Sequence, residues 1–312
     1  MNTLREALED YLALRRAMGF QIRDACSLLR QFVAYLESRE AQSITTELAL
    51  DWATGQQGVQ PAQWARRLTL VRGFARYRSG TDPRTQIPAP GLLPYRPKRA
   101  SPYLYSDAQI EQLLEVAAQL PSPTGLRAQT YVTAFALLAV TGMRVGELVA
   151  LDEGDVDLDA GQLTIRRGKL GKSRLLPLHP SSQDALRHYA RQRDRCYPIP
   201  ASPAFLVSER GARLSHWALR RTFVMLSHRI GLRQPGDSHG PRLHDLRHRF
   251  AVEVLLRWYR DGVDVERRLP ELSTYLGHVK VSDTYWYLSA TPELLRLALE
   301  RVEHSQPAGM WP

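Results

Sequence analysis

The sequence has little cysteine and no long apolar run, and each absence narrows the possible classes of protein. Its 312 residues include only two cysteines, Cys26 and Cys196, which stand far apart. A disulfide framework is therefore not expected, and a cytoplasmic location is predicted. The longest strongly apolar run, residues 131–143, is shorter than the roughly 20 residues of a membrane span, so it predicts a buried helix. The first ten residues are charged and have no apolar core, so no signal peptide and no membrane partner are predicted.

A nucleotide-binding phosphate loop is also absent, although the letters GKS at 171–173 resemble its end. That loop requires a glycine five positions before Gly171, and Arg166 stands there instead. It also requires a strand that leads into a helix, whereas this segment lies between two strand-like runs. We therefore expect neither ATP nor another cofactor.

The segment HDLRH, residues 244–248, has part of the pattern of a zinc-hydrolase helix. His244 and His248 stand four residues apart, which places both rings on one helical face. Asp245, however, is shorter than the glutamate that usually acts as the base. Arg247 projects to the same side as His244, where its charge would repel a metal ion. No metal is predicted, and a zinc-dependent hydrolase remains an alternative.

Positive charge is what the chain has in excess. It contains 42 Lys and Arg against 32 Asp and Glu, a formal net charge of +10. An excess of this size is typical of proteins that bind polyanions. An ordinary basic protein is the alternative until the charges are seen to cluster.

The first 80 residues predict a helical domain. Apolar residues recur at helical spacing through residues 28–36, and a further helix is predicted from about Trp64. Arg66, Arg72 and Arg76 fall outside the apolar stripe of this later helix. They are candidates for contacts with DNA phosphates, and a solvated charged face is the alternative.

Residues 81–102 are rich in proline and in positive charge. Proline blocks the continuation of a helix and favours extended chain, so this segment predicts a linker. It would connect the helical domain, 1–80, with a second domain, 103–312. Lys98 and Arg99 are further candidates for DNA contact, and an ordinary extended spacer is the alternative.

The second domain predicts mainly helices with a small β-sheet. Two short β-like segments, 162–166 and 174–178, flank the letters RGKLGKS and predict a hairpin. Residues 205–211 are predicted to add a third strand. Helices are expected before and after this group, including one opened by the capping residue Ser106.

Three motifs occur in a fixed order along this domain: TGMRVGELVAL at 141–151, HDLRHRFA at 244–251 and LGHVKVSDTYWYL at 276–288. With the hairpin lysine, they resemble the tyrosine recombinases of the phage integrase family, and the resemblance covers nearly the whole chain. It implies a helical core-binding domain followed by an α+β catalytic domain, which together form a C-shaped DNA clamp.

The resemblance also assigns residues. Arg144 and Arg247 match the family's arginine pair, and His244 and His278 match its two histidines. Lys169 matches the lysine of the β-hairpin.

The family places its nucleophilic tyrosine nine positions after the last histidine, which selects Tyr287 over Tyr285. Lys172 is the alternative hairpin lysine and a candidate for DNA contact. Glu147 matches an acidic position where it could orient Arg144 by an i,i+3 contact.

The implied activity is site-specific DNA recombination through a covalent 3′-phosphotyrosyl intermediate, without ATP or metal. The arginines would stabilise the negative charge that develops on the equatorial oxygens of the phosphate, His244 would act as the base, and Lys169 would protonate the leaving 5′ oxygen. Double-stranded DNA with a specific recombination site is the expected partner, bound by four protomers, with a second recombinase as a further possible partner.

Two features of the family remain open in this chain. The ending SDTYWYLSATPELL resembles integrases of transposons and related mobile elements. Residues 293–302 predict an apolar helix that docks either on a neighbouring protomer or on its own domain. A relaxing topoisomerase of the type IB class is the alternative with the same chemistry.

Overall fold

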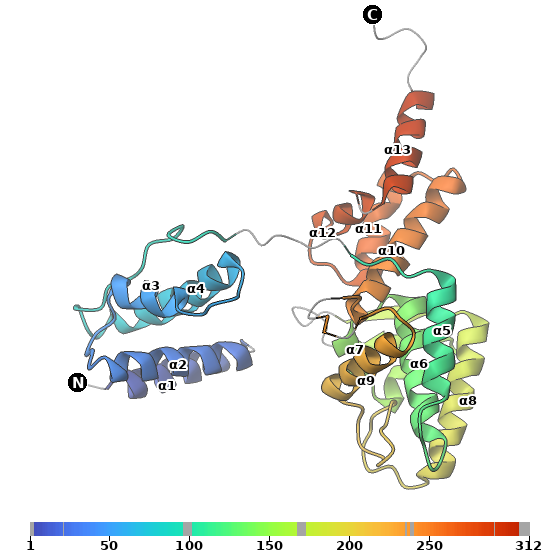
Figure 1. The fold of residues 1–312 in the computed structure, drawn as a ribbon, viewed down its shortest axis with the longest axis horizontal. Helices are drawn as coiled ribbons and strands as arrows, with labels where there is room; N and C mark the ends of the chain where they lie inside the picture. The colour runs from blue at the N-terminus through green and yellow to red at the C-terminus, as the bar shows by residue number, and fades with distance from the viewer. Residues whose placement is uncertain are drawn as a thin grey trace, which may run out of the picture. The chain divides into compact units, whose positions relative to one another are not determined.

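The computed structural model describes residues 3–20, 22–95, 102–166, 173–234, 236–237, 240–289 and 291–305. The chain divides into two compact units, Met1–Ala100 and Ser101–Pro312 (Figure 1). Among the described residues, every helix is too short or too polar to cross a membrane.

The first unit is built from four helices whose apolar faces meet in one core. These are α1 (Leu4–Ala17), α2 (Arg23–Ser38), α3 (Thr46–Thr54) and α4 (Pro61–Arg78). Helix α1 begins at Thr3, whose hydroxyl accepts from the amide of Glu6 in a capping box. The side chains of Phe32 and Phe74 are fully buried in the core. The helices predicted from apolar spacing are present.

The chain after α4 remains packed on this unit up to Tyr95. The amide of Gln86 donates to the carbonyl of Ile44 at 2.7 Å, and Leu93 packs against the helical core. Asp82 is fully buried. The first part of the proline-rich segment is thus attached to the helices, and 96–101 lie outside the described residues.

The second unit is mostly helical, which confirms the predicted fold class. Its helices are α5 (Asp107–Ala118), α6 (Leu126–Thr141), α7 (Val145–Ala150), α8 (Pro180–Cys196), α9 (His216–Arg229), α10 (Leu243–Arg260), α11 (Val265–Leu276), α12 (Ser282–Tyr285) and α13 (Pro292–Ser305), with short 3₁₀ turns η1 (Glu153–Asp155) and η3 (Trp286–Ser289). Helix α6 contains most of the apolar run 131–143 and lies against α5, α8 and α10. Because neighbours cover it on several sides, its buried residues are not confined to one stripe.

The sheet is small and antiparallel, in the order β1 (Val156–Asp157), β2 (Gln162–Ile165), β3 (Arg174–Pro177). Leu163 pairs with Leu176, and both are fully buried on the face that meets the core. The two predicted hairpin strands are confirmed.

The strand predicted at 205–211 was wrong, because β1 is the third strand of the sheet. After Val207, the amide of Ser208 donates to the carbonyl of Ala212, and Gly211 takes a positive φ of 71°. The chain therefore folds back on itself at once, and Val207 forms only an isolated bridge with Arg213 in the described chain.

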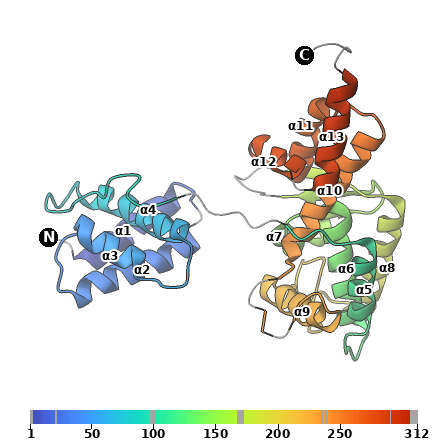
Figure 2. The ribbon, with the colours of Figure 1, turned by 45° about the horizontal axis from the view of Figure 1, so that its top comes forward.

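The last four helices gather at one end of the second unit, as Figure 2 shows. They surround a separate apolar cluster that contains Leu255, Leu269, Leu276, Tyr287 and Leu294. Helix α13 lies against α10 of its own unit. Its Leu295 and Leu299 side chains remain more than half exposed.

Candidate active site

The first arginine of the site stands at the start of α7. Gly142 ends α6 with a left-handed φ of 59°, and Arg144 then caps α7. The backbone amide of Arg144 donates to Glu147 Oε2 at 2.9 Å, and its Nη1 donates to Oε1 at 2.7 Å. The i,i+3 contact predicted between these two residues is present.

The second arginine, Arg247, lies on α10 and is only 2% exposed. Its Nη1 donates to the carbonyl of Gly142 at 2.8 Å, and its Nη2 donates to the carbonyl of Leu276 at 2.7 Å. Burial and the nearby Arg144 charge lower the pKa of Arg247 to about 10. The guanidinium therefore remains charged at neutral pH.

A third arginine, Arg174, joins the site from β3. Its guanidinium grips Glu147 through two hydrogen bonds of 3.0 and 2.8 Å, and its Nε donates to the carbonyl of Tyr275 at 2.7 Å. Burial alone would raise the pKa of Glu147, but the hydrogen bonds from Arg174 and Arg144 lower it to about 2. Sequence reasoning missed Arg174; its only signal was an arginine at the start of an otherwise apolar strand.

The last turn of α11 holds all three arginines. The consecutive carbonyls of Tyr275, Leu276 and Gly277 accept hydrogen bonds from Arg174, Arg247 and Arg144, respectively. Carbonyls at a helix C-terminus have no partner within the helix and carry partial negative charge, so they are natural acceptors for cations.

The two tyrosines that follow α11 face different surroundings. Tyr287, in η3, is 2% exposed, whereas Tyr285 is 52% exposed. Arg247 lies near enough to the Tyr287 phenol for its charge to act on the pKa of that group. Burial raises the pKa of Tyr287, and the charges of Arg247 and Arg144 partly oppose this rise.

His278 lies beside the buried phenol. Its ring stacks on that of Tyr287 with 6.0 Å between centroids, and its Nδ1 lies 2.8 Å from Thr284 Oγ1. Loss of hydration and the charges of Arg247 and Arg144 lower the pKa of His278 to about 4. The imidazole is therefore neutral at pH 7.

His244 and His248 follow one another along α10, with 4.7 Å between ring centroids. Loss of hydration around the imidazole and the Arg247 charge lower the pKa of His244. His248 is buried against Trp286 and Tyr287, and burial lowers its pKa to about 4. Within the described ranges, no three metal-ligating side chains come together.

A pocket of about 430 Å³ opens beside Arg144 and His244, between the start of α7, α9 and the start of α10. Most of its polar lining is basic. The basic residues are Arg144, His216, Arg220, Arg233, Arg242 and His244. Such a lining suits an anion of the size of a phosphodiester.

The family model described as "Phage integrase family" matches residues 104–293, which is more than half of the chain. This chain belongs to the phage integrase family. The resemblance inferred from three short motifs is thereby confirmed.

Relatives extend the match beyond the catalytic unit. The Sinorhizobium fredii protein y4rB, provisionally named an integrase/recombinase, is 52% identical over 307 residues, covering 97% of this chain and 98% of the relative. Tyrosine recombinase XerA of Thermococcus kodakarensis is 31% identical over 306 residues, covering 97% of this chain and 96% of the relative. The predicted enzyme class, one that cleaves and rejoins DNA strands, is confirmed, and neither alternative is favoured.

Solved structures share the fold of this phage integrase family member. XerH site-specific recombinase bound to palindromic difH substrate has a TM-score of 0.67 at 18% identity, covering 96% of this chain and 85% of that chain. The Tn1549 transposon integrase in complex with transposon right end DNA has a TM-score of 0.66 at 17% identity, covering 97% and 100%.

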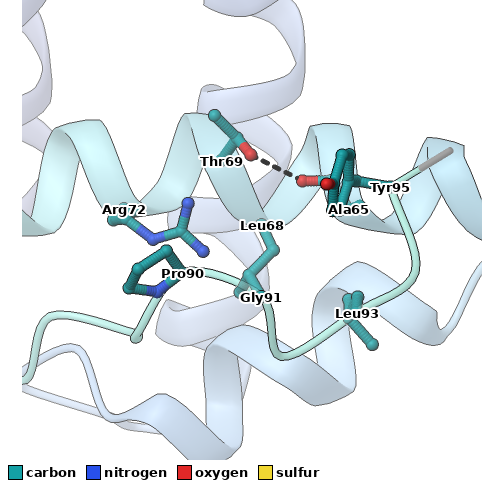
Figure 3. Close-up of a pocket in the computed structure, with 8 residues that line it drawn as sticks. All are labelled: Ala65, Leu68, Thr69, Arg72, Pro90, Gly91, Leu93 and Tyr95. Carbon is teal, nitrogen blue, oxygen red and sulfur yellow. Dashed lines mark hydrogen bonds between the residues drawn. The ribbon is translucent and has the colours of Figure 1, made fainter.

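The residues predicted to contact DNA outside the catalytic cluster divide into three groups. Arg66 and Arg76 are exposed on α4, and Arg66 forms a 3.6 Å ion pair with Asp24. Arg72 instead donates to the carbonyls of Pro88 and Ala89 and borders a small pocket (Figure 3). The third group, Lys98, Arg99 and Lys172, lies outside the described residues, as does the catalytic candidate Lys169.

Proposed function

We propose that this chain is a site-specific recombinase whose Tyr287 forms a 3′-phosphotyrosyl link with DNA. One observation carries the proposal: Tyr287, the strongly buried tyrosine of the LGHVKVSDTYWYL motif, stacks on His278 and lies within reach of the charges of Arg247 and Arg144. A phosphodiester in the basic pocket would contact Arg144 and His244, and the proposal requires the phenol of Tyr287 to reach the phosphorus from its buried place beside them.

The arginines supply the electrostatic part of the reaction. Attack on a phosphodiester increases the negative charge on the non-bridging oxygens, and fixed donors aimed at those oxygens lower the barrier. Arg144 and Arg247 are held by main-chain carbonyls and by Glu147, so they reorganise little when that charge develops. A guanidinium fork is also matched to two phosphate oxygens.

Proton transfer requires a base and an acid. Burial raises the pKa of Tyr287, so the phenol holds its proton at neutral pH until a base accepts it. His244, whose pKa is lowered, is neutral and is the proposed acceptor. The tyrosyl oxygen then bonds to phosphorus, the bond to the 5′ oxygen breaks, and Lys169 gives that oxygen a proton.

His278 is the proposed donor to a non-bridging oxygen. A neutral imidazole that accepts from the Thr284 hydroxyl at Nδ1 carries its proton on Nε2. That nitrogen can then donate to the phosphate. The energy of the broken bond is retained in the phosphotyrosyl link, so rejoining requires no ATP.

The wider assembly is proposed by analogy with the solved relatives. These relatives include recombinases solved on DNA, among them a lambda integrase tetramer bound to a Holliday junction. We infer that residues 1–80 and residues 103–312 each contact duplex DNA, with 81–102 as the connector, in the cytoplasm. Four protomers would pair two recombination sites of a mobile element, with Arg66, Arg76, Lys98, Arg99 and Lys172 on the backbone.

The test is covalent trapping on nicked duplexes with randomised sequence around the nick, in EDTA. Wild-type protein is expected to form an adduct, and mass spectrometry of the modified peptide should map DNA to Tyr287. Tyr287→Phe should abolish the adduct, whereas the matched variant Tyr285→Phe should retain it. An adduct that maps to Tyr285, or that requires metal, would refute the proposal.

Supercoiled plasmid of arbitrary sequence distinguishes the topoisomerase alternative. A recombinase with a specific site should leave most such plasmid supercoiled. Efficient relaxation at rates equal to those on the trapped sequence would favour a topoisomerase instead.

A further inference from the structure

We propose that Arg174 is a positioning residue for cleavage: by holding Glu147 and the last turn of α11 together, it fixes the place of Arg144. This inference rests on the proposed function, because it concerns how the phosphate-binding arginine is held. Neither the motifs nor the comparisons assign Arg174 a role.

The contacts form a closed ring. Arg174 joins the Tyr275 carbonyl to Glu147, Glu147 accepts two hydrogen bonds from Arg144, and Arg144 returns to the Gly277 carbonyl. The ring begins and ends on the same helical turn, two residues apart. Removal of one member therefore opens the ring, and Arg144 keeps only part of its support.

Arg174 is poorly suited to bind phosphate itself. Its side chain is 11% exposed, and its two Nη groups are engaged with the carboxylate of Glu147 at 3.0 and 2.8 Å. Its charge is largely neutralised there, while Arg144, whose side chain is 26% exposed, borders the basic pocket. Arg144 is thus placed to contact the phosphate, and Arg174 is placed to support Arg144.

Glu147 is the connection between the two. Its side chain is 8% exposed and receives three guanidinium hydrogen bonds and one amide hydrogen bond. Without Arg174, half of the carboxylate's charged partners are lost in a buried place. The carboxylate would then draw Arg144 closer or take up a proton, and either change moves Arg144.

The surroundings of Gly277 give a second, independent indication that the Arg174 guanidinium is closely packed. A Cβ built on Gly277 would lie 2.8 Å from Arg174 Nη1 and 3.0 Å from its Cζ. The guanidinium is thus packed on the bare backbone of the turn whose carbonyl holds Arg144. The space beside Gly277 accommodates the planar guanidinium of Arg174, and the ammonium group of a lysine is not planar.

The experiment measures single-turnover adduct formation and equilibrium binding on the trapped DNA sequence. Arg174→Met is expected to slow adduct formation by about 100-fold, the scale of a misplacement near 1 Å, while duplex affinity changes less than about 3-fold. Arg174→Lys should recover only a small part of the rate. A full recovery with lysine, or an unchanged rate with methionine, would overturn the proposal.

A matched control separates positioning from general stability. Arg187, on α8, also donates to a carbonyl, that of Leu158, and to a carboxylate, that of Asp184, but it lies outside the ring. Arg187→Met should keep the rate within about 2-fold, as surface substitutions usually do. Equal losses in Arg187→Met and Arg174→Met would show that the effect is not specific to the ring.

A double-mutant cycle tests whether Arg174 acts through Glu147. If it does, Arg174→Met combined with Glu147→Gln should slow the reaction no further than the more severe single variant. Arg174→Met should also move the acid side of the pH–rate profile to higher pH, because Glu147 without that partner titrates at higher pH, and Glu147→Gln should remove this titration. Additive losses and an unmoved profile would contradict the ring.

A spectroscopic readout keeps this test apart from the test of Tyr287. The Nε–Hε signal of the Arg144 guanidinium, followed by NMR in the full chain without DNA, should shift in Arg174→Met and stay in place in Arg187→Met. If wild-type protein forms no adduct, the proposed function fails while this measurement still decides the positioning role. An unchanged Arg144 signal in Arg174→Met would refute the role.

Discussion

The arginines around the end of α11 and the arginines along α4 are held in different ways. Arg247 is buried and bonded to two main-chain carbonyls, whereas Arg76 is exposed and Arg66 has an ion pair of 3.6 Å. A cation lowers a reaction barrier only if it is already in place when charge develops. An exposed cation attracts DNA at a distance and tolerates many positions. Burial thus suits the arginines around α11 to the proposed chemistry, and exposure suits those on α4 to the proposed attraction of DNA.

The largest effect is expected when an arginine that is bonded to main-chain carbonyls is removed. Arg247→Ala should leave the Gly142 and Leu276 carbonyls without their charged donor and lower the free energy of unfolding by about 3 kcal/mol. The rate of adduct formation should fall by at least about 1000-fold. Urea unfolding and single-turnover trapping measure the two effects. An unfolding midpoint equal to that of wild type would show that Arg247 is not held as described.

The turn that holds the arginines can be disturbed without touching them. Gly277→Ala places a methyl group against Arg174 at a left-handed φ of 67°, so adduct formation should fall by about 10-fold to 100-fold. Gly262→Ala is the matched variant, because it has a φ of 69° and open space around its Cβ. Both should lower thermal stability by about 1 kcal/mol, and only the first should slow cleavage. Equal rates of adduct formation in the two variants would show that the turn at Gly277 does not affect cleavage.

Residues 1–100 contain no histidine. A pH dependence of stability that arises from histidine is therefore expected only in the second unit. His248 and His278 have folded pKa values of about 4, below the ordinary 6.5, because burial favours their neutral forms. Their contribution to stability is therefore complete above pH 6.5 and is lost as the pH falls towards 4. The free energy of unfolding should decrease over this interval, and less steeply in His248→Gln. Urea titrations at a series of pH values measure the slope; an equal slope in the variant would contradict the burial.

The smallest effect is expected on α4. Arg76→Ala should weaken duplex binding several-fold and reduce the slope of log affinity against log salt by about 1, with the rate at saturating DNA unchanged. Binding measured from low to moderate salt tests this, with Arg30→Ala on α2 as a control that removes an exposed cation paired with Glu9. A fall in the rate at saturating DNA would show that Arg76 contributes to cleavage and not only to DNA binding.

Much of the site could be predicted because it is encoded locally. The contact of Arg144 with Glu147 follows from helical spacing, and the choice of Tyr287 over Tyr285 follows from counting along one motif; Tyr287 is indeed the buried one. Arg174 could not be found in this way, because its partners lie 27 and 101 residues away and only the fold brings them together.

The same limit applies to the fold. The hairpin strands β2 and β3 are adjacent in sequence and were predicted, whereas the two-residue strand β1 has no alternation to reveal it. Arg72 lies outside the apolar stripe of α4, as a phosphate contact would, yet its guanidinium binds the carbonyls of Pro88 and Ala89. Periodicity shows which way a side chain faces and not what the rest of the chain places there.

The last turn of α11 also sets the starting point of the segment that carries the proposed nucleophile. His278 follows Gly277 directly, and Tyr287 comes nine residues later. One short turn therefore provides the acceptors for three guanidiniums and the start of the segment that leads to the phenol, so a single displaced turn would disturb both.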